Sequence, residues 1–446
     1  MLLGAAALYF LYFFGLTRTG LLGPDEPRYA AIGKAMADSG DWVTPRLWNQ
    51  PWFEKPALLY WMTAAGFKAG LGLDLAPRLP VAMASIAFLI YFFLALRREF
   101  GARAAFYATT ILSTSAAWLA FSRVAVTDLP MSAAFAGTML AVLSGRSRVL
   151  AGVLLGLAVL AKGLVPLVLF LPALWFWRKR LADILVLLAV GAAVAAPWYV
   201  LVTLRNGPPF LEDFFWKHHF ARYLTGALQH ERPVWFYLPV LAAGLFPWSP
   251  LLWFSFEKRI YNDARVMLLL GWFAWGFLFF SVSRNKLPGY LLPLFPALAA
   301  LIGIAMADAK LPTVKMACLL AACAALLSLI PAIQEVLPQA LVSGLSRAQI
   351  RLSPGIWLVP ALSIMFICGF LEWKSRREWA VAAIALLTTI AVVRVVVQVY
   401  PSLDRQVSAR YQWNSSVNSI TCVSTVNRAA RYGLSYYAGR DLPDCN

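Results

Sequence analysis

The chain has 446 residues, of which 61% are hydrophobic and 13% are charged, and its mean hydropathy is +0.68. Soluble domains contain about 25% charged residues, so the composition excludes a soluble globular protein. Apolar runs of about 15 to 22 residues recur along almost the whole length, and they predict a polytopic membrane protein made of helices.

The net charge of +18 bears on the partners of the protein. Lysine and arginine are scattered between the apolar runs and form no patch interleaved with aromatic residues, which argues against a nucleic-acid-binding protein. Anionic lipid headgroups and lipid-linked phosphates are the counterparts expected of a basic membrane protein. We therefore predict membrane lipids as partners and no nucleic acid.

Hydropathy predicts about thirteen membrane spans. In chain order they cover residues 2–16, 79–96, 104–121, 131–144, 149–161, 164–177, 181–203, 234–254, 266–282, 290–307, 314–332, 355–371 and 379–399. The first run has no basic region ahead of it and further runs follow, so we interpret it as a permanent span and not as a cleaved signal. The sequence shows no internal repeat.

Basic residues predict the orientation of these spans. Every alternate loop is short and basic, as with Arg97, Arg98 and Arg103 after the second span. The positive-inside rule makes these loops cytoplasmic. The outward-facing loops are then 17–78, 122–130, 204–233, 283–289, 333–354 and the tail from 400.

The first outer loop, residues 17–78, is too long for a plain connector. Its apolar residues Tyr29, Ile32 and Met36 recur at helical spacing, which predicts a helix lying in the membrane interface. A second helix is expected over about 56–68.

An acidic pair, Asp25 and Glu26 in "PDEPRYA", lies where the first span leaves the membrane. A carboxylate next to hydrocarbon is costly, so this position suggests chemistry at the membrane surface. Asp128, in "VTDLP", lies on the next outward loop. Asp25 and Asp128 each also suit a helix N-cap beside a proline. If their loops converge, one carboxylate acts as a general base and the other orients it, and Glu26 has no assigned role.

Basic residues are also abundant on the outward side, where orientation does not require them. Lys162 interrupts an apolar stretch in "LAVLAKGLV", where it either snorkels to the surface or contacts a phosphate. Lys286 and Tyr290, in "SRNKLPGYLLPLFP", can offer a phosphate a point charge and a hydroxyl group. Together with Arg28 and Lys55 in the first loop, they suggest an outward-facing anionic substrate.

The outer loop at 204–233 contains "FLEDFFWKHHFARYLTG", in which His219 and Arg222 are candidate contacts of an acceptor. Adjacent histidines near a glutamate can bind zinc, which makes Glu54 and His219 candidate metal ligands. Adjacent histidines on irregular structure are weak evidence in themselves. We therefore predict no certain cofactor and keep a divalent metal as an alternative.

The five cysteines fall into two groups. Cys318, Cys323 and Cys368 lie inside apolar runs and are expected to be small core residues. Cys422 and Cys445 lie in the polar tail, where an oxidising compartment permits a disulfide. Paired and free thiols both remain open for these two residues.

The ordered set of motifs resembles the lipid-phosphate-dependent glycosyltransferases of the GT-C membrane fold. The motifs are "PDEPRYA", "GDWVTPRL", "FEKPALLYW", "VTDLP", "AKG", "FARYLTG", "WFYLPVL", "FPWS" and "SRNKLPGYLLPLFP". The most similar groups are the aminoarabinose transferases that act on lipid A and the bacterial relatives of protein O-mannosyltransferases. The resemblance covers about residues 20–300, and it rests on the order of the motifs because none is specific alone.

The resemblance implies a sugar donor on an undecaprenyl-type polyprenyl phosphate and a lipid or glycan acceptor such as lipid A, at the periplasmic face of the bacterial inner membrane. By motif, Asp25 matches the catalytic carboxylate of the family and Asp128 its second acidic residue. Lys55 resembles the lysine that contacts the donor phosphate. Lys162 and Tyr290 resemble further phosphate contacts, and help from Arg28 or Lys286 is expected.

Two departures from the family pattern limit what is implied. Glu54 resembles a possible metal ligand, but His218 stands where relatives tend to show an acidic residue before "HF". The polar tail after about residue 400 is also short beside the periplasmic domain of longer relatives. We therefore expect that the acceptor of this protein can differ from that of the longer relatives.

These observations predict an all-α GT-C glycosyltransferase with a transmembrane domain over 1–399 and a short periplasmic segment over 400–446. A protein O-mannosyltransferase-like enzyme is the alternative. A transporter or flippase of lipid-linked sugars predicts charges near the bilayer midplane and repeated halves. Clustering of the charges at one face and the lack of a repeat favour the enzyme, and the paired carboxylates argue against a lipid-binding scaffold.

Overall fold

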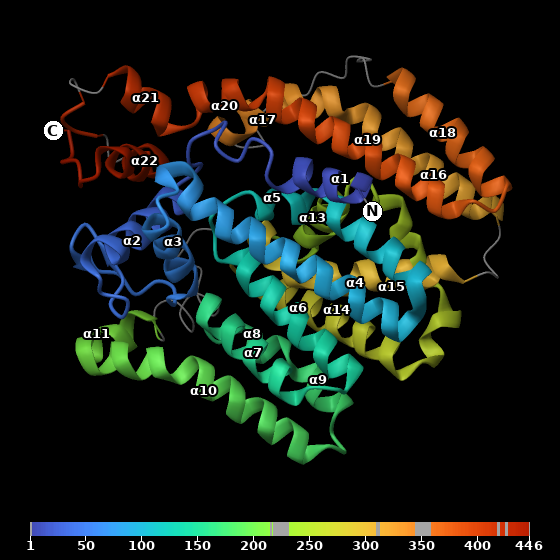
Figure 1. The fold of residues 1–446 in the computed structure, drawn as a ribbon, viewed down its shortest axis with the longest axis horizontal. Helices are drawn as coiled ribbons and strands as arrows, with labels where there is room; N and C mark the ends of the chain where they lie inside the picture. Colours follow the sequence, from blue (N-terminus) through green and yellow to red (C-terminus); the bar gives the residue numbers. More distant parts are fainter. Residues whose placement is uncertain are drawn as a thin grey trace.

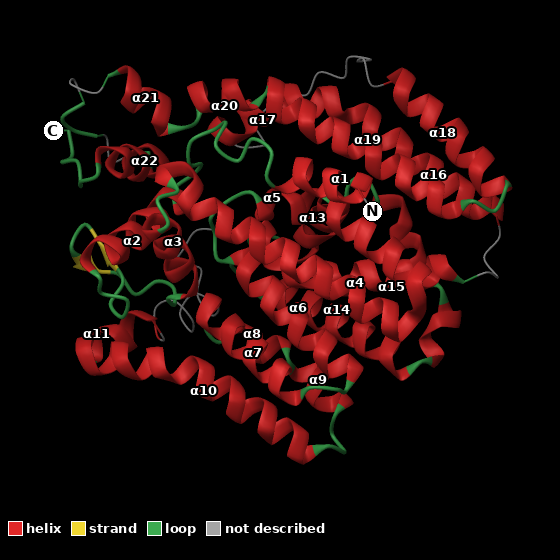
Figure 2. Cartoon of the chain, in the orientation of Figure 1, coloured by secondary structure: helices red, strands yellow, loops and turns green. Residues whose placement is uncertain are grey.

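The protein is almost entirely helical in the computed structural model (Figure 2), which describes residues 2–214, 216, 232–308, 313–343, 358–416, 420–423 and 427–445. Among these residues, one antiparallel sheet pairs β1 (Arg46–Leu47) with β2 (Gln50–Pro51). The all-α fold class predicted from the composition is therefore confirmed.

The helices follow the apolar runs of the sequence. Those of the N-terminal half are α1 (Leu2–Tyr12), α2 (Asp25–Ser39), α3 (Leu58–Lys68), α4 (Gly72–Thr114), α5 (Ala116–Ser122), α6 (Asp128–Ser144), α7 (Arg148–Lys162), α8 (Val165–Leu169), α9 (Leu171–Phe176), α10 (Leu181–Asn206) and α11 (Pro208–Leu211). Those of the C-terminal half, in which η marks a 3-10 helix, are η2 (Val234–Phe236), α13 (Tyr237–Leu245), η3 (Ser249–Phe256), η4 (Lys258–Asn262), α14 (Ala264–Val282), η5 (Pro288–Leu294), α15 (Phe295–Ala307), α16 (Thr313–Leu326), η6 (Leu327–Leu329), α17 (Ile330–Ser343), α18 (Leu358–Trp373), α19 (Arg377–Gln398), α20 (Tyr400–Gln406), α21 (Ala409–Ser415) and α22 (Arg428–Ala438).

The protein is a multi-pass membrane protein. Within the described ranges, six helical segments are long and apolar enough to cross a membrane: α4, α10, α14, η5 with α15, α16 to α17, and α19. Shorter apolar helices include α6, α8 with α9, η2 with α13, and α18. The number of about thirteen spans stays a prediction.

Two predicted spans are joined in α4, which has 43 residues. Its helical geometry breaks at Gly101, where φ is 88°, between the arginines assigned to the first cytoplasmic loop. Glycine adopts this positive φ without the steric cost that a side chain would add.

The predicted span 234–254 is not one helix. α13 ends at Leu245, and η3 begins only at Ser249. Pro247 lies between them and has no N–H to continue a helical ladder. The break is fixed against the neighbouring helices, because Trp248 donates to the Thr114 hydroxyl at 2.8 Å.

The core lies where α4, α6, α14 and α15 meet in the middle of the molecule, with α16, α18 and α19 on one side and α7 and α10 on the other (Figure 1). α15 approaches the backbone of α4 closely. A Cβ atom at Gly303 would lie 2.6 Å from the amide nitrogen of Ala108, so only glycine fits.

The two helices expected in the first outer loop are present as α2 and α3, which lie beside α22 at one end of the molecule (Figure 1). α2 is covered by protein more fully than its apolar spacing predicts, and its position in the membrane interface stays a prediction. Residues on both of its faces are buried, and Arg28 is only 3% exposed. α3 and α22 provide this cover.

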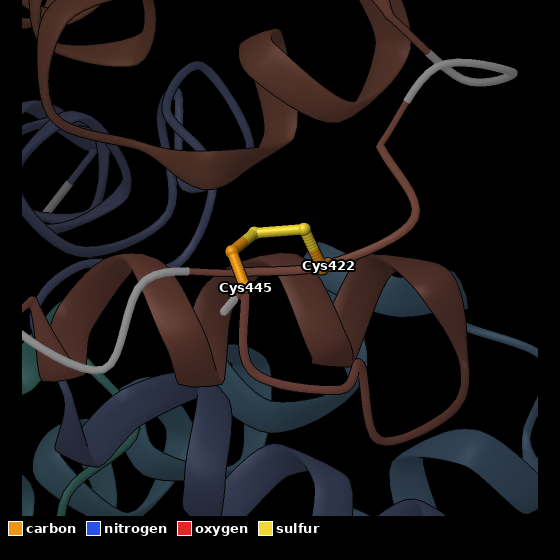
Figure 3. The surroundings of a disulfide bond; sticks show 2 residues. All are labelled: Cys422 and Cys445. Atoms are coloured by element: carbon orange, nitrogen blue, oxygen red, sulfur yellow. A yellow bond between two sulfur atoms is a disulfide. The ribbon is translucent and has the colours of Figure 1, made fainter.

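The tail cysteines Cys422 and Cys445 form a disulfide, with their Cα atoms 5.0 Å apart (Figure 3). Cys323 and Cys368 are buried free thiols, as expected of core residues. Cys318 is exposed, so the prediction that it lies in the core is wrong.

Candidate active site

Asp25 opens α2 and presents a carboxylate at the surface of the molecule. The N-cap position belongs to Pro24, and no side-chain capping bond is made there, so Asp25 does not serve as the cap. Its side chain is 52% exposed and accepts a hydrogen bond from Arg28 Nη2 at 2.6 Å. The carboxylate is therefore oriented by a charged partner and still open to a substrate.

Arg28 bridges two carboxylates. Its Nη2 lies 2.6 Å from Asp25 Oδ1 and 2.9 Å from Glu54 Oε2. Burial by itself would lower the pKa of Arg28, but Glu54 and Asp25 raise that pKa above its usual value. The guanidinium therefore stays charged and holds α2 against the loop that carries Glu54.

Three aromatic rings surround the Arg28 guanidinium. Its Cζ lies 5.2 Å from the ring centroid of Tyr29 and 5.4 Å from those of Trp52 and Tyr432. These distances are within the range of cation–π attraction. The rings come from α2, from the loop before α3 and from α22, so the site depends on segments that are far apart in the sequence.

Lys55 continues this series of alternating charges. Its Nζ lies 3.3 Å from Glu54 Oε1 and both side chains are mostly buried. Asp25, Arg28, Glu54 and Lys55 are hereafter called the loop cluster.

A second group, hereafter the helix cluster, consists of Asp128, Lys162 and Tyr290. Lys162, the last residue of α7, places its Nζ 2.6 Å from Asp128 Oδ1 and 5.0 Å from the ring centroid of Tyr290. Asp128 makes no capping bond at the start of α6. The two charged side chains are 17% and 12% exposed, so Lys162 is paired and does not simply snorkel.

A buried ion pair that the sequence did not reveal connects these two groups. Glu26 and Arg78 are each 1% exposed, and the Arg78 guanidinium binds both Glu26 oxygens at 2.7 and 2.8 Å. Glu26 also accepts from the amides of Leu22 at 2.7 Å and Ala125 at 2.9 Å. Since Ala125 lies three residues before Asp128, Glu26 ties the chain around Asp25 to the start of α6.

Arg78 completes this link through the backbone of the first loop. It donates to the carbonyl oxygens of Leu16, Thr19 and Gly20 at 2.6 to 2.9 Å. A buried arginine at the membrane end of α4 needs such partners, because an unpaired charge there is very costly. Its unusual position in "LAPRLP" was the available sequence signal.

Lys286 lies in the loop that leads to Tyr290, and its side chain contacts backbone carbonyl groups. Its ammonium donates to the backbone carbonyls of Ser283 and, at 3.2 Å, of Arg232. Burial lowers the pKa of Lys286. The structure thus shows Lys286 holding the loop 283–289, and its contact with a phosphate stays a prediction.

The remaining predicted contacts concern the acceptor and a metal ion. His219 and Arg222 lie outside the described residues. Within the described ranges, no group of three or more His, Cys, Asp or Glu side chains could hold a metal ion. Glu54, the other metal candidate, is engaged by Arg28 and Lys55.

An apolar groove lies next to the loop that leads to Tyr290, between α13 and the C-terminal part of α14. Its lining consists of Val234, Trp235, Leu238, Phe273, Ala274, Phe277, Leu278 and Ser281. The Tyr237 hydroxyl donates to the Leu287 carbonyl at 3.3 Å, which links α13 to that loop. The groove therefore offers an apolar ligand a surface beside the loop that leads to Tyr290.

Comparison with solved structures defines the class of protein to which this fold belongs. ArnT from Cupriavidus metallidurans bound to undecaprenyl phosphate superposes with a TM-score of 0.79 and 26% identity, over 99% of this chain and 85% of that one. The oligosaccharyltransferase of Archaeoglobus fulgidus shares the fold at a TM-score of 0.52 and 14% identity, over 88% of this chain and 55% of that one. The protein has the GT-C fold of these membrane transferases.

The family model of the dolichyl-phosphate-mannose-protein mannosyltransferases matches residues 1–225, and the chain belongs to this family. The undecaprenyl phosphate-α-4-amino-4-deoxy-L-arabinose arabinosyl transferase 2 of Pseudomonas fluorescens is 35% identical over 69% of this chain and 56% of its own length. The Pseudomonas aeruginosa arabinosyl transferase is also 35% identical, over 69% of this chain and 59% of its own. The chain thus spans less than two thirds of these relatives.

Proposed function

We propose that the protein is a glycosyltransferase that moves a sugar from undecaprenyl phosphate to lipid A or another glycan at the periplasmic face of the bacterial inner membrane. The observation that carries this proposal is that the Glu26–Arg78 pair links the chain around the loop cluster to the start of α6, which carries Asp128 of the helix cluster. The likeness to a structure holding undecaprenyl phosphate and to arabinosyl transferases supports the donor and acceptor classes.

In the proposed reaction, the bond between the anomeric carbon and the phosphate oxygen breaks, and an acceptor oxygen bonds to that carbon. The electron pair stays on undecaprenyl phosphate, whose growing negative charge Lys55, Lys162 and Tyr290 stabilise. The groove between α13 and α14 suits the polyprenyl tail.

Asp25 acts on the acceptor in the proposed reaction. Its half-exposed carboxylate can take the proton of an acceptor hydroxyl as the new bond forms. If the acceptor is itself a phosphate, there is little to deprotonate and Asp25 mainly orients it. Asp128 acts through Lys162, with which it forms an ion pair.

Mass spectrometry of lipid A and of glycoproteins tests this proposal in cells that carry the wild-type gene, no gene or the Asp25→Asn variant. We expect a sugar-modified product with the wild type only. Asp38→Asn is the matched control, because Asp38 lies on the same helix, is 63% exposed and pairs with Lys34 at the surface. An unchanged product in the Asp25→Asn cells contradicts the catalytic role of Asp25.

A protein acceptor is the second candidate, and the family match over residues 1–225 favours it. The same experiment separates the two: modified glycoproteins with unmodified lipid A support the protein acceptor. Cells in which neither product depends on the gene contradict the proposed transfer.

A further inference from the structure

The C-terminal segment, residues 400–445, is attached to the loop that precedes Asp25. The amide of Gly20 donates to Asp404 Oδ1 at 2.7 Å, and the amide of Leu21 donates to the Tyr437 hydroxyl at 2.8 Å. The contact is close enough to require glycine, since a Cβ atom at Gly20 would lie 2.6 Å from that hydroxyl. The segment therefore fits against the backbone of the first loop.

Asp74 fixes the same segment to the start of α4. It accepts hydrogen bonds from Arg410 Nη1 at 2.6 Å and from the Tyr437 hydroxyl at 2.7 Å. Arg410 also pairs with Asp404 at 2.9 Å. Because Arg78 lies one helical turn after Asp74, the segment and the buried Glu26–Arg78 pair share one anchor.

Tyr432 extends this contact to the loop cluster. It lies in the middle of α22, and its ring is one of the three that surround the Arg28 guanidinium. Arg28 has a buried Nε without a hydrogen-bond partner, so the position of its guanidinium depends on the two carboxylates and on these rings. Loss of one ring would let the guanidinium, and Asp25 with it, change orientation.

We propose that Tyr432 is a positioning residue of the transferase site, acting through the face of its ring on Arg28 and thereby on Asp25. The C-terminal segment is then part of the site and not an appendage. This inference rests on the proposed function, because its main measurement is the rate of sugar transfer.

The test compares Tyr432→Leu and Tyr432→Phe in the purified full chain, with the undecaprenyl-phosphate sugar that the wild type uses. The contact is made by the ring, so we expect Leu to lower kcat about tenfold with an unchanged KM for the donor, and Phe to restore the wild-type rate. Tyr411→Leu is the matched control, because Tyr411 lies in the same segment with its side chain 47% exposed.

A second series keeps the shape of the side chain in case the leucine variant folds poorly. Phenylalanines with increasing numbers of fluorine atoms at position 432 weaken the negative face of the ring, and kcat should fall stepwise along the series. If the wild type is active and kcat does not change along the fluorinated series, the inference about Tyr432 is overturned and the proposed function is not. A Tyr432→Leu rate equal to that of the Tyr411→Leu control has the same meaning. A wild type that transfers no sugar from any donor overturns the proposed function and this inference together.

Discussion

Asp25 and Glu26 are neighbours in the sequence, but their environments give them different roles. Glu26 is buried with both oxygens bound by Arg78, so it has no capacity left for a substrate. Asp25 is half-exposed and held on one oxygen by Arg28. Pairing and exposure therefore leave Asp25, and not Glu26, accessible to a substrate, and residue type alone does not reveal this difference.

Lys162 gives a prediction at the residue scale. Its ammonium is mostly buried and contacts both Asp128 and the face of the Tyr290 ring. In the proposed site, the same ammonium also contacts the donor phosphate. Charge-assisted hydrogen bonds contribute about 1.5–3 kcal/mol, so Lys162→Met should weaken binding of undecaprenyl phosphate roughly 10- to 100-fold. A binding isotherm of the purified protein measures this change.

Lys34→Met is the control for that measurement. Lys34 also pairs with an aspartate, but at the surface of α2 with 37% of its side chain exposed, and its loss should leave the binding curve in place. Equal affinities of the two variants for undecaprenyl phosphate would contradict a contact between Lys162 and the donor phosphate.

At the scale of elements, the site depends on how three loops are held together. The Glu26–Arg78 pair joins the first loop, the start of α4 and the turn before α6. Such a buried pair sets the geometry of the elements that carry the candidate site residues, so its loss should lower the free energy of unfolding.

Arg78→Met should therefore destabilise the protein by about 3–5 kcal/mol, because it leaves the Glu26 carboxylate buried without a counter-charge. The double variant Glu26→Leu with Arg78→Met should recover part of this loss, since no buried charge remains. Thermal unfolding in detergent checks both. Arg98→Met, on the same helix with its side chain 40% exposed, should change the midpoint little, and an equal shift would contradict the account.

The C-terminal segment gives a prediction about its disulfide bond. Cys422 and Cys445 are paired, whereas Cys318, Cys323 and Cys368 are free. Alkylation of the denatured, unreduced protein should label three of the five thiols, and all five after reduction. Intact mass measures the number of labels, and five labels before reduction would show that the tail thiols are not joined.

At the scale of the whole molecule, hydropathy was a good guide to the helices. Backbone groups in lipid must be satisfied within the chain, so long apolar runs have few alternatives to a helix. The breaks in the helices have local causes: Gly101 breaks α4 in the predicted loop between two spans, and Pro247 divides the predicted span at 234–254. Both residues were visible in the sequence, but the packing that accommodates them was not.

The grouping of candidate residues was predictable where hydropathy assigns their loops to the same side of the membrane. The sequence assigned Asp25, Asp128 and Lys162 to the outward side, and the structure brings Asp128 and Lys162 into contact. Arg78 and Tyr432 were missed, because their partners lie far away along the chain; Arg78 and Glu26 are 52 residues apart. The position of Arg78 was an available signal, but a single sequence does not show with which distant residue it pairs.

The central claim is that outward-facing charged groups release a sugar from undecaprenyl phosphate. The most direct measurement is mass spectrometry of the products that the purified chain forms from its undecaprenyl-phosphate-linked sugar donor and lipid A. The account predicts free undecaprenyl phosphate and sugar-modified lipid A in equal amounts, with a strongly reduced yield for the Lys55→Met, Lys162→Met double variant. Equal product formation by the wild type and the double variant would contradict it.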